Sequence, residues 1–157
     1  MAKKTNTKRP IHPKLKLAGT KPAKELKRWD VTRVWSKKLG KPFTPVSSYF
    51  LDNYHRLPNK ITHGEFVLIV HLLKYKWDEA MPFPAIATLA KKMEKSDQAV
   101  RATARTLENK GYLKRNMIRG RPNHYDLEPL FRAIEKLYDA DEAAKTKKRS
   151  AKSHQTG

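Results

Sequence analysis

The sequence predicts a mainly α-helical domain with one small β-hairpin, flanked by basic arms at both ends. Three observations lead to this fold class. Apolar residues recur at helical spacing in several segments between residues 48 and 137, and one short segment alternates around a glycine turn. The third observation is charge, because 35 Lys and Arg stand against 15 Asp and Glu in 157 residues, a formal net charge of +20.

The charge excess lies mostly outside the central part of the chain. Residues 1–46 hold 14 basic and 2 acidic residues, residues 47–140 hold 16 and 11, and residues 141–157 hold 5 and 2. Residues 1–20 and 139–157 have no periodic apolar pattern, so both are predicted to be basic disordered arms. This excess attracts polyanions, and nucleic acid is the expected partner.

Residues 21–60 are predicted to form an N-terminal extension with short helices. Its first part begins with a proline and ends with a glycine, as a helix does, yet Trp29 and Trp35 belong to an alternating pattern typical of a strand. Residues 23–39 therefore fit either structure. The segment "SSYFLDNYHRL" has a serine cap and apolar residues at helical spacing, which predicts a short helix that ends near Pro58.

Residues 61–138 are predicted to form the folded domain, which begins with a helix at "THGE". In this motif Thr62 and Glu65 have the capping-box spacing, in which each side chain binds the other residue's backbone N–H. The helix continues as an apolar stripe to Trp77 and is apolar on its other side as well. Its second face should therefore be covered, either by the helix at residues 47–57 or by a partner subunit.

Two helices, a hairpin and a last helix are predicted to follow. "MPFPAIATLAKKM" resumes helical spacing after its prolines, and "EKSD" separates it from a helix that Ser96 can cap and Gly111 can end. "YLKRNMI" and "HYDL" flank the turn "RGRPN", which predicts a β-hairpin. "EPLFRAIEKLYDA" then predicts a helix with Pro129 in its first turn.

The helix predicted at residues 97–110 has two different faces. At 100° per residue, Val100, Ala104 and Leu107 lie together on one of them. The opposite face carries Gln98, Arg101, Ala102, Arg105 and Asn109. These residue types suit base reading, because Arg can bond guanine, Gln or Asn can bond adenine, and Ala permits close approach. Ordinary solvated helix faces also carry Arg and Gln. The hairpin that follows is therefore needed to decide between a DNA-reading face and a solvated one.

The tip of the predicted hairpin is basic. Arg119 and Arg121 stand on a turn made by glycine and proline, a shape and charge suited to a narrow minor groove or to phosphates. Basic residues also keep exposed strands soluble, which is the alternative explanation of the same pattern. The succession of an arginine-bearing helix and a basic hairpin favours DNA binding.

This order of elements resembles the winged helix-turn-helix family of bacterial, phage and plasmid DNA-binding proteins. The resemblance covers about residues 61–137, and its strongest local match is "FPAIATLAKKMEKSDQAVRATARTLENKGYLKR". More narrowly, "KWDEAMPFPAIATLAKKM" with "LEPLF" is similar to helix-turn-helix modules near replication and transfer functions of mobile elements. The chain departs from the family at the turn, where Glu94 or Lys95 stands in place of the usual glycine.

Carried over by position, the resemblance implies a role for each matching residue. Ala90 is expected to pack where the helices cross and Val100 to pack in the core. Major-groove contacts are expected from Ser96, Gln98, Arg101 and Arg105, and wing contacts from Arg119 and Arg121. The full set expected to contact DNA is Ser96, Gln98, Arg101, Ala102, Arg105, Asn109, Lys91, Lys92, Lys114, Arg119, Arg121 and Asn123.

Nothing in the sequence indicates an enzyme. The six histidines, at positions 12, 55, 63, 71, 124 and 154, include no pair spaced to present two metal ligands on one helix face. Cysteine is absent, and no Walker A, G-x-S-x-G or dinucleotide glycine motif occurs. The expectation is therefore no catalytic site, no metal and no cofactor.

The first interpretation is a sequence-specific double-stranded DNA-binding protein that regulates transcription. It reads the major groove with the helix at 97–110 and the backbone or minor groove with the wing at 119–123. One alternative is a plasmid or phage replication initiator of the same fold. Another class is an RNA- or ribosome-associated protein, although the major groove of A-form RNA is too narrow for a helix.

A homodimer is a further expectation, because a second subunit would cover the apolar helix at residues 66–77. The longest apolar run, "FVLIVHLL", is too short to span a bilayer, and the N-terminus has no apolar signal region. The expected location is the bacterial cytoplasm or nucleoid.

Overall fold

The computed structural model describes residues 31–153, and the arm predicted at residues 1–20 lies outside them. The chain divides into two units, with the boundary between Lys41 and Pro42. In the first unit, the described part of the undecided segment contains α1 (Val31–Trp35), which is helical. Gly40 packs closely there, since an added Cβ would lie 2.7 Å from the Cα of Thr32.

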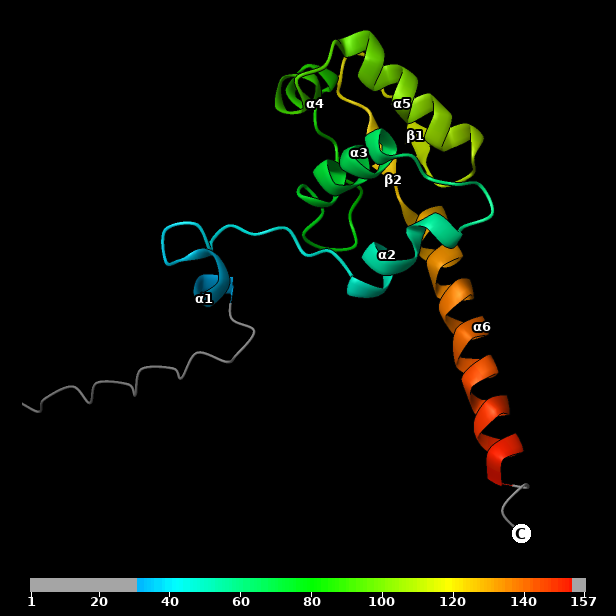
Figure 1. Ribbon diagram of the computed structural model, residues 1–157. Coiled ribbons are helices and arrows are strands. Elements are labelled where there is room, and N and C mark those ends of the chain that lie inside the picture. The colour runs from blue at the N-terminus through cyan, green and yellow to red at the C-terminus, as the bar shows by residue number, and fades with distance from the viewer. Residues whose placement is uncertain (1–30, 154–157) are drawn as a thin grey trace, which may run out of the picture. The chain divides into compact units, whose positions relative to one another are not determined.

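The second unit is mainly helical with one two-stranded antiparallel sheet (Figure 1), as predicted. Its elements, in chain order, are α2 (Ser48–Asn53), the 3₁₀ helix η1 (Tyr54–Arg56), α3 (His63–Leu73), α4 (Ile86–Met93), α5 (Asp97–Asn109), β1 (Lys114–Asn116), β2 (His124–Asp126) and α6 (Glu128–Ser153). The short helix expected before Pro58 is therefore present as α2 and η1.

Side chains cap three of these helices at the predicted residues. The hydroxyls of Ser47, Thr62 and Ser96 accept hydrogen bonds from backbone N–H groups at the starts of α2, α3 and α5. At α3 the capping box is complete, because the Glu65 carboxylate also accepts from the N–H of Thr62, at 2.8 Å. Each cap satisfies a backbone donor that the first turn of a helix leaves free.

The core lies where α3, α4, α5, the sheet and the start of α6 meet. Val100, Ala104 and Leu107 of α5 are all buried, as the periodicity predicted, and so is Ala90 of α4. Leu68, Ile69 and Leu72 of α3, Leu89, Tyr125 and Leu130 complete the most buried part of the same cluster. One face of α5 is therefore held by packing, which fixes the orientation of the other.

The second face of α3 is covered from within the chain. Phe50 and Tyr54 place their ring centroids 5.5 and 4.8 Å from that of Phe66. A partner subunit was one of the two expected covers for this face. In the structure α2 and η1 cover it instead. The predicted stripe extends too far, however, because α3 ends at Leu73 and Trp77 is 65% exposed in the loop that follows.

The turn between α4 and α5 is made without glycine. Glu94 adopts the left-handed conformation, with φ 51° and ψ 45°, and the N–H of Lys95 donates to the carbonyl of Ala90. A glycine would adopt this conformation at no steric cost. The turn therefore keeps the shape expected of the pattern although its residue differs.

The two strands of the hairpin are shorter than predicted, and a third segment of the chain hydrogen-bonds to β2. Arg115 pairs with Tyr125 in the antiparallel register, and β1 and β2 have three residues each. The N–H of Tyr125 also donates to the carbonyl of Pro82, at 2.9 Å, so the segment before α4 lies against the outer edge of β2. This bond ties the hairpin to the loop that leads into α4.

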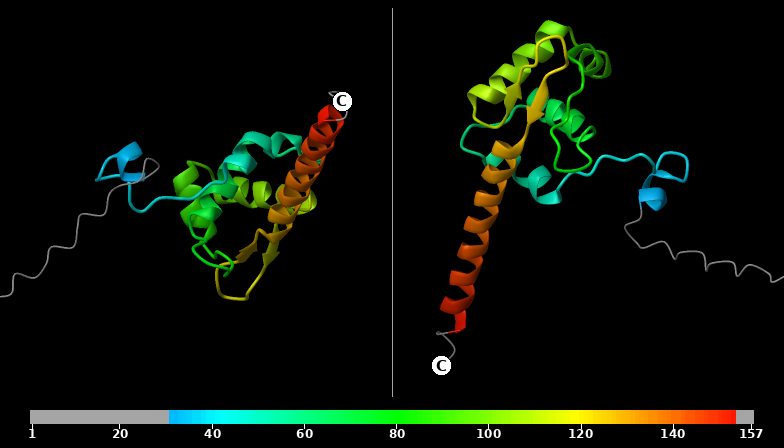
Figure 2. Two further views of the ribbon diagram at one scale, coloured as in Figure 1. Left: turned by 90° about the horizontal axis from the view of Figure 1, so that it is seen from below. Right: turned by 180° about the vertical axis from the view of Figure 1, so that it is seen from behind.

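The C-terminal tail is not a disordered arm over residues 139–153. These residues continue α6, which runs unbroken from Glu128 to Ser153. Tyr49 and Arg56 explain part of the difference, since both bind Asp141 midway along the helix, at 2.7 and 2.6 Å. Beyond this anchor α6 projects away from the rest of the unit (Figures 1 and 2).

Candidate nucleic-acid interface

The exposed face of α5 carries the residues that the sequence indicated. The side chains of Gln98, Arg101, Ala102, Arg105 and Asn109 are all exposed, opposite the buried stripe of the same helix. Arg101 approaches Asp97 only at 3.9 Å, and both side chains are about half exposed. Such a surface pair is weak, so the guanidinium is free to exchange Asp97 for another acceptor.

Ser96 has a structural task at the start of this face. Its hydroxyl oxygen accepts from the N–H of Ala99, at 3.1 Å. The hydroxyl proton remains available, and the side chain is exposed. Ser96 therefore caps α5 first, and any contact with a phosphate would come in addition.

A groove of about 420 Å³ joins α5 to the hairpin tip. It is lined by Ala85, Ile86, Ala87, Asp97, Arg101, Arg121, Pro122 and Asn123. The groove brings Arg101 and Arg121 to one surface although 20 residues separate them in sequence. The starts of α4 and α5 and the hairpin tip thus line one groove, in which Arg101 and Arg121 are basic and Asp97 is acidic.

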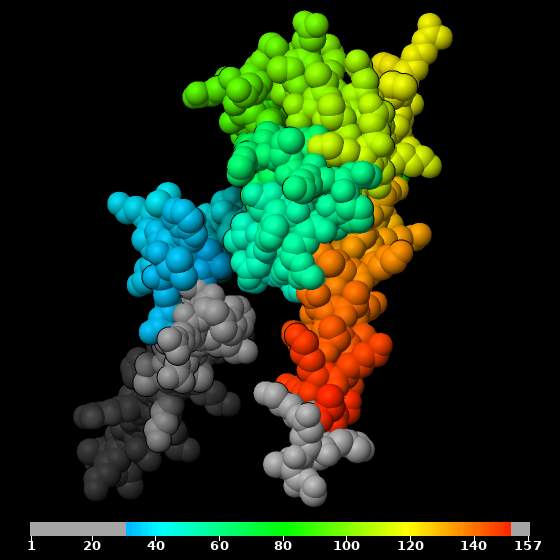
Figure 3. All heavy atoms as spheres, turned by 45° about the vertical axis from the view of Figure 1, so that its right-hand side comes forward, coloured from blue at the N-terminus to red at the C-terminus, as the bar shows by residue number. Residues whose placement is uncertain are grey.

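The turn at the hairpin tip explains the sequence "RGRPN". The N–H of Arg121 donates to the carbonyl of Ile118, at 3.1 Å, and Gly120 has φ 73° at the third position of this β-turn. A positive φ at that position is the usual reason for glycine in a turn. Arg119 and Arg121 are exposed on either side of it, and the tip protrudes in the space-filling view, at the upper right (Figure 3).

The three predicted phosphate-binding lysines are exposed, but they do not form one group. Lys91 and Lys92 lie on α4, where they line a shallow depression with Ala87 and Thr88. Lys114 lies on β1, outside the groove described above. Lys91 and Lys92, which the sequence had already indicated, are thus exposed on α4, whereas Lys114 lies at a different place.

Lys74 is a candidate that sequence reasoning missed. Repulsion from Lys92 is the main cause that lowers the pKa of Lys74, so the two ammonium groups lie close together. Burial, with these two lysines, also lowers the pKa of His71. A phosphate placed between like charges would relieve their repulsion. Only the packing of α3 against α4 reveals this pair, because 18 residues separate it in sequence.

Two ion pairs hold α5 in position beneath this surface. Glu108 of α5 accepts from the backbone N–H of Arg115, at 2.8 Å, and from its guanidinium, which ties α5 to β1. Glu65 of α3 accepts from Thr106 and Lys110 at the end of α5, at 2.8 and 2.6 Å. These bonds fix the position of α5 relative to the hairpin and to α3, and with it the placement of the exposed face of α5.

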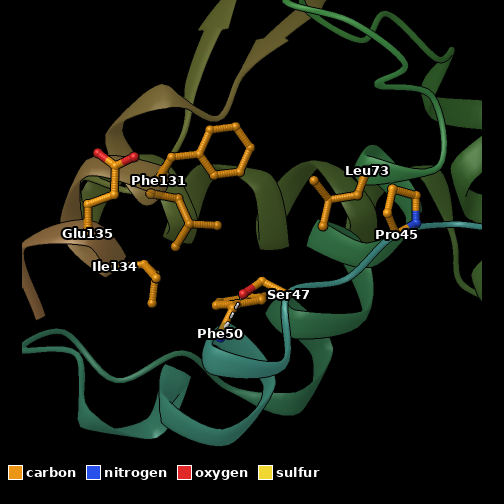
Figure 4. A pocket seen from close by; sticks show the side chains of 8 residues that line it. Pro45, Ser47, Phe50, Leu73, Phe131, Ile134 and Glu135 are labelled. Atoms are coloured by element: carbon orange, nitrogen blue, oxygen red, sulfur yellow. Dashed lines mark hydrogen bonds between the residues drawn. The ribbon is translucent and has the colours of Figure 1, made fainter. Parts of the chain in front are cut away.

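An apolar hollow of about 310 Å³ lies elsewhere, between the start of α2, the end of α3 and α6. Figure 4 shows Phe50, Leu73, Phe131 and Ile134 around the same space. Its other lining residues are Pro45, Ser47, Leu130 and Glu135. Because no basic side chain lines it, this hollow does not extend the candidate interface.

Within residues 31–153, no group of three or more His, Asp or Glu side chains could hold a metal ion. Nor does any helix in this range combine the length and apolar character needed to cross a membrane.

Comparison with known proteins identifies a relative of the fold. The family model described as the DnaD N-terminal domain matches residues 46–148. Among solved structures, the N-terminal domain of the DnaD protein from Geobacillus kaustophilus is similar, with a TM-score of 0.54 and 23% sequence identity. The match covers 73% of this chain and 96% of that one, and at this identity it concerns the fold alone. No curated protein is significantly similar in sequence.

Proposed function

We propose, from the premise that the chain belongs to the DnaD N-terminal domain family, that it binds double-stranded DNA in the course of DNA replication. Membership in this family supports a DNA-binding, replication-associated role. It lends no specific support to transcriptional regulation, the first interpretation of the sequence, and it favours the replication alternative over it. The family does not single out a plasmid or phage origin.

The proposed binding mode is that of a winged helix-turn-helix. In it α4 and α5 form the helix-turn-helix, α5 enters the major groove, and the hairpin contacts the backbone or minor groove as a wing. The observation that carries the proposal is the groove that Arg101 shares with Arg121. In the proposed mode, the exposed face of α5 contacts bases and the basic turn contacts the backbone of the same duplex.

Family membership also supports a homo-oligomer. We do not assign its interface to α3, because Phe50 and Tyr54 already pack against Phe66. We place the protein in the bacterial cytoplasm or nucleoid and assign it no catalytic activity. An RNA- or ribosome-associated role is retained as an outcome of the following test.

The test separates base reading from backbone contact. Arg101→Ala should cost ~1 to 3 kcal/mol on a selected duplex and little on random duplex, because bidentate base contacts are specific. Arg121→Ala should weaken both duplexes by similar factors, since a phosphate is the same everywhere. Competition titrations against the selected duplex, random duplex and structured RNA measure the difference.

The control is a melting curve for each variant, since exposed substitutions usually change stability by less than ~0.5 kcal/mol. Equal losses on all three ligands for Arg101→Ala would reject base reading by α5. Tighter binding of RNA than of either duplex would favour the RNA-associated class.

A further inference from the structure

The C-terminal part of α6 differs in charge from the rest of that helix. Residues 128–142 hold five acidic and two basic residues, whereas residues 143–153 hold five basic residues and no acidic one. The change of sign falls just after Asp141, where the helix leaves the packed part of the unit. The projecting segment is therefore strongly cationic and carries no apolar residue larger than alanine.

The basic residues of this segment are placed mainly on one helix face. Lys145, Lys148 and Arg149 follow the spacing i, i+3 and i+4, which gathers them within about 100° of arc. We call these three residues the α6 stripe. Lys148 and Arg149 make no ion pair within the described residues, and Lys145 pairs only with Glu142, at 2.8 Å and largely exposed. The stripe continues the face that bears Tyr138 and Asp141.

The α6 stripe directly follows the point at which α6 is fastened to the rest of the unit. Asp141 receives two hydrogen bonds from the Arg56 guanidinium and one from the Tyr49 hydroxyl, and the Tyr49 and Tyr138 rings meet edge to face at 5.0 Å. From this anchor to Ser153 the helix extends by ~18 Å at 1.5 Å per residue. A flexible tail would need no such anchor to carry the same charge.

The stripe and the candidate interface lie at opposite ends of the second unit. In the views of Figure 2 the end of α6 is the part farthest from the hairpin tip, and Figure 3 shows the two at opposite ends of the surface. A straight duplex seated on α5 and the hairpin would therefore leave the α6 stripe unused. The ligand of the α6 stripe therefore has to be a second molecule, or a distant segment of the duplex that α5 and the hairpin hold.

The chemistry of the stripe selects the ligand. A helix that docks on a protein or a membrane needs apolar anchors, and this segment has none. Phosphate contacts require only positive charge at suitable places, and duplex DNA carries one negative charge per ~1.7 Å of its axis. The dipole of the helix favours cations in its last turn alone, which does not account for Lys145 and Lys148.

We propose that the α6 stripe is a second DNA contact, which binds the phosphate backbone of a separate duplex segment while α5 and the hairpin hold the first. This inference rests on the proposed function for the first duplex. One molecule then holds two duplex segments, an arrangement suited to bridging or looping DNA. Binding by the stripe is independent of sequence.

The experiment uses the full chain and measures two quantities. The first is the affinity for one short duplex, and the second is the capture of a fluorescent duplex by protein already bound to a duplex on beads. The test variant carries Lys148→Gln and Arg149→Gln. The matched control carries Lys136→Gln and Lys147→Gln, which removes equal charge from exposed positions on the opposite face of the same helix.

The expected result is roughly tenfold less capture by the test variant and a change of less than about twofold in its single-duplex affinity. The control should capture almost as well as the parent. Circular dichroism and sedimentation should show unchanged helix content and association state in both variants.

Three results would overturn the proposal. If the test variant still captured the second duplex, bridging would belong to another surface or to an oligomer. If the control variant lost as much capture as the test variant, the effect would come from total charge and not from the α6 stripe. Stripe-dependent capture of structured RNA or polyglutamate in preference to duplex would identify a different ligand. Failure of the proposed function gives a different result. In that case Arg101→Ala would leave the affinity for a single duplex unchanged, while capture of the second duplex would still depend on the α6 stripe.

Discussion

At the scale of a single residue, Glu65 has two structural roles. It completes the capping box of α3 and also binds Thr106 and Lys110 of α5, with only 3% of its surface exposed. Burial alone would raise the pKa of its carboxyl, but the hydrogen bonds from Lys110, Thr62 and Thr106 outweigh burial and lower it. The charged form is therefore the one that the fold stabilises.

Glu65→Gln should lower the free energy of unfolding by ~1 to 3 kcal/mol at pH 7, because a buried charge-assisted network loses its acceptor. The folded pKa lies below the usual 4.5, so this contribution is complete above pH 4.5 and disappears as pH falls through the folded pKa. Urea unfolding of both proteins over pH 3 to 7 should show the gap closing in acid. The exposed Glu135→Gln serves as control, and a gap that widens in acid would contradict the argument.

Two turn residues make a pair of opposite predictions. Glu94 holds φ 51° with a side chain, whereas Gly111 holds φ 78° at the end of α5 with open space around it. Glu94→Gly should raise stability by up to ~1 kcal/mol, and Gly111→Ala should lower it by ~1 kcal/mol, because only glycine adopts this region without strain. Thermal melting of the two variants beside the parent measures both signs. The same sign in both would show that φ does not control these positions.

At the scale of elements, α6 is fastened at its middle by a tertiary contact. The Arg56 guanidinium, with the Tyr49 hydroxyl, holds the pKa of the Asp141 carboxyl well below its usual range. This contact lies 85 residues apart in sequence and fastens the middle of α6 to η1. The helix beyond it has no apolar face with which to pack.

Arg56→Ala should therefore loosen the second half of α6 and leave the core intact. Hydrogen exchange of the backbone amides between residues 138 and 150 should become faster, while α3 and α5 keep their protection. Arg132→Ala, which breaks the exposed pair with Glu128 at the start of the same helix, is the matched control. Equal acceleration in the control would mean that the anchor has no special role.

At the scale of the whole molecule, charge is distributed over surfaces with separate tasks. Residues 1–19 contribute six basic and no acidic residues, α5 and the hairpin carry the proposed reading surface, and α6 ends in the basic stripe. In the proposed function, long-range attraction of DNA draws on all of them, whereas specificity comes from base contacts and from the shape of the duplex.

Deletion of residues 1–19 should weaken binding to every duplex and flatten the dependence of log K on log salt. The slope should fall by roughly 0.9 for each phosphate that the shortened protein no longer neutralises. Titrations at several salt concentrations on selected and random duplexes measure it. An unchanged slope would show that these residues do not bind phosphates, and a weakening confined to the selected duplex would assign them a specific role.

Sequence by itself determined the features whose causes are local. Caps at Ser47, Thr62 and Ser96, the buried stripe of α5 and the glycine turn of the hairpin each depend on residues within a few positions of one another. Helical and strand periodicities, cap chemistry and positive φ can therefore be read along the chain. The exposed candidate residues of α5 followed for the same reason.

Only the tertiary structure decided which distant groups meet. It placed Arg101 and Arg121 on one groove, Lys74 near Lys92 and Pro82 against Tyr125. It also turned an expected disordered tail into the end of α6, because the anchor at Asp141 is a contact that no local pattern contains. Periodicity detects a helix by its apolar face. The end of α6 has no such face and follows an anchor made by one distant ion pair and a tyrosine, so no local pattern indicates it.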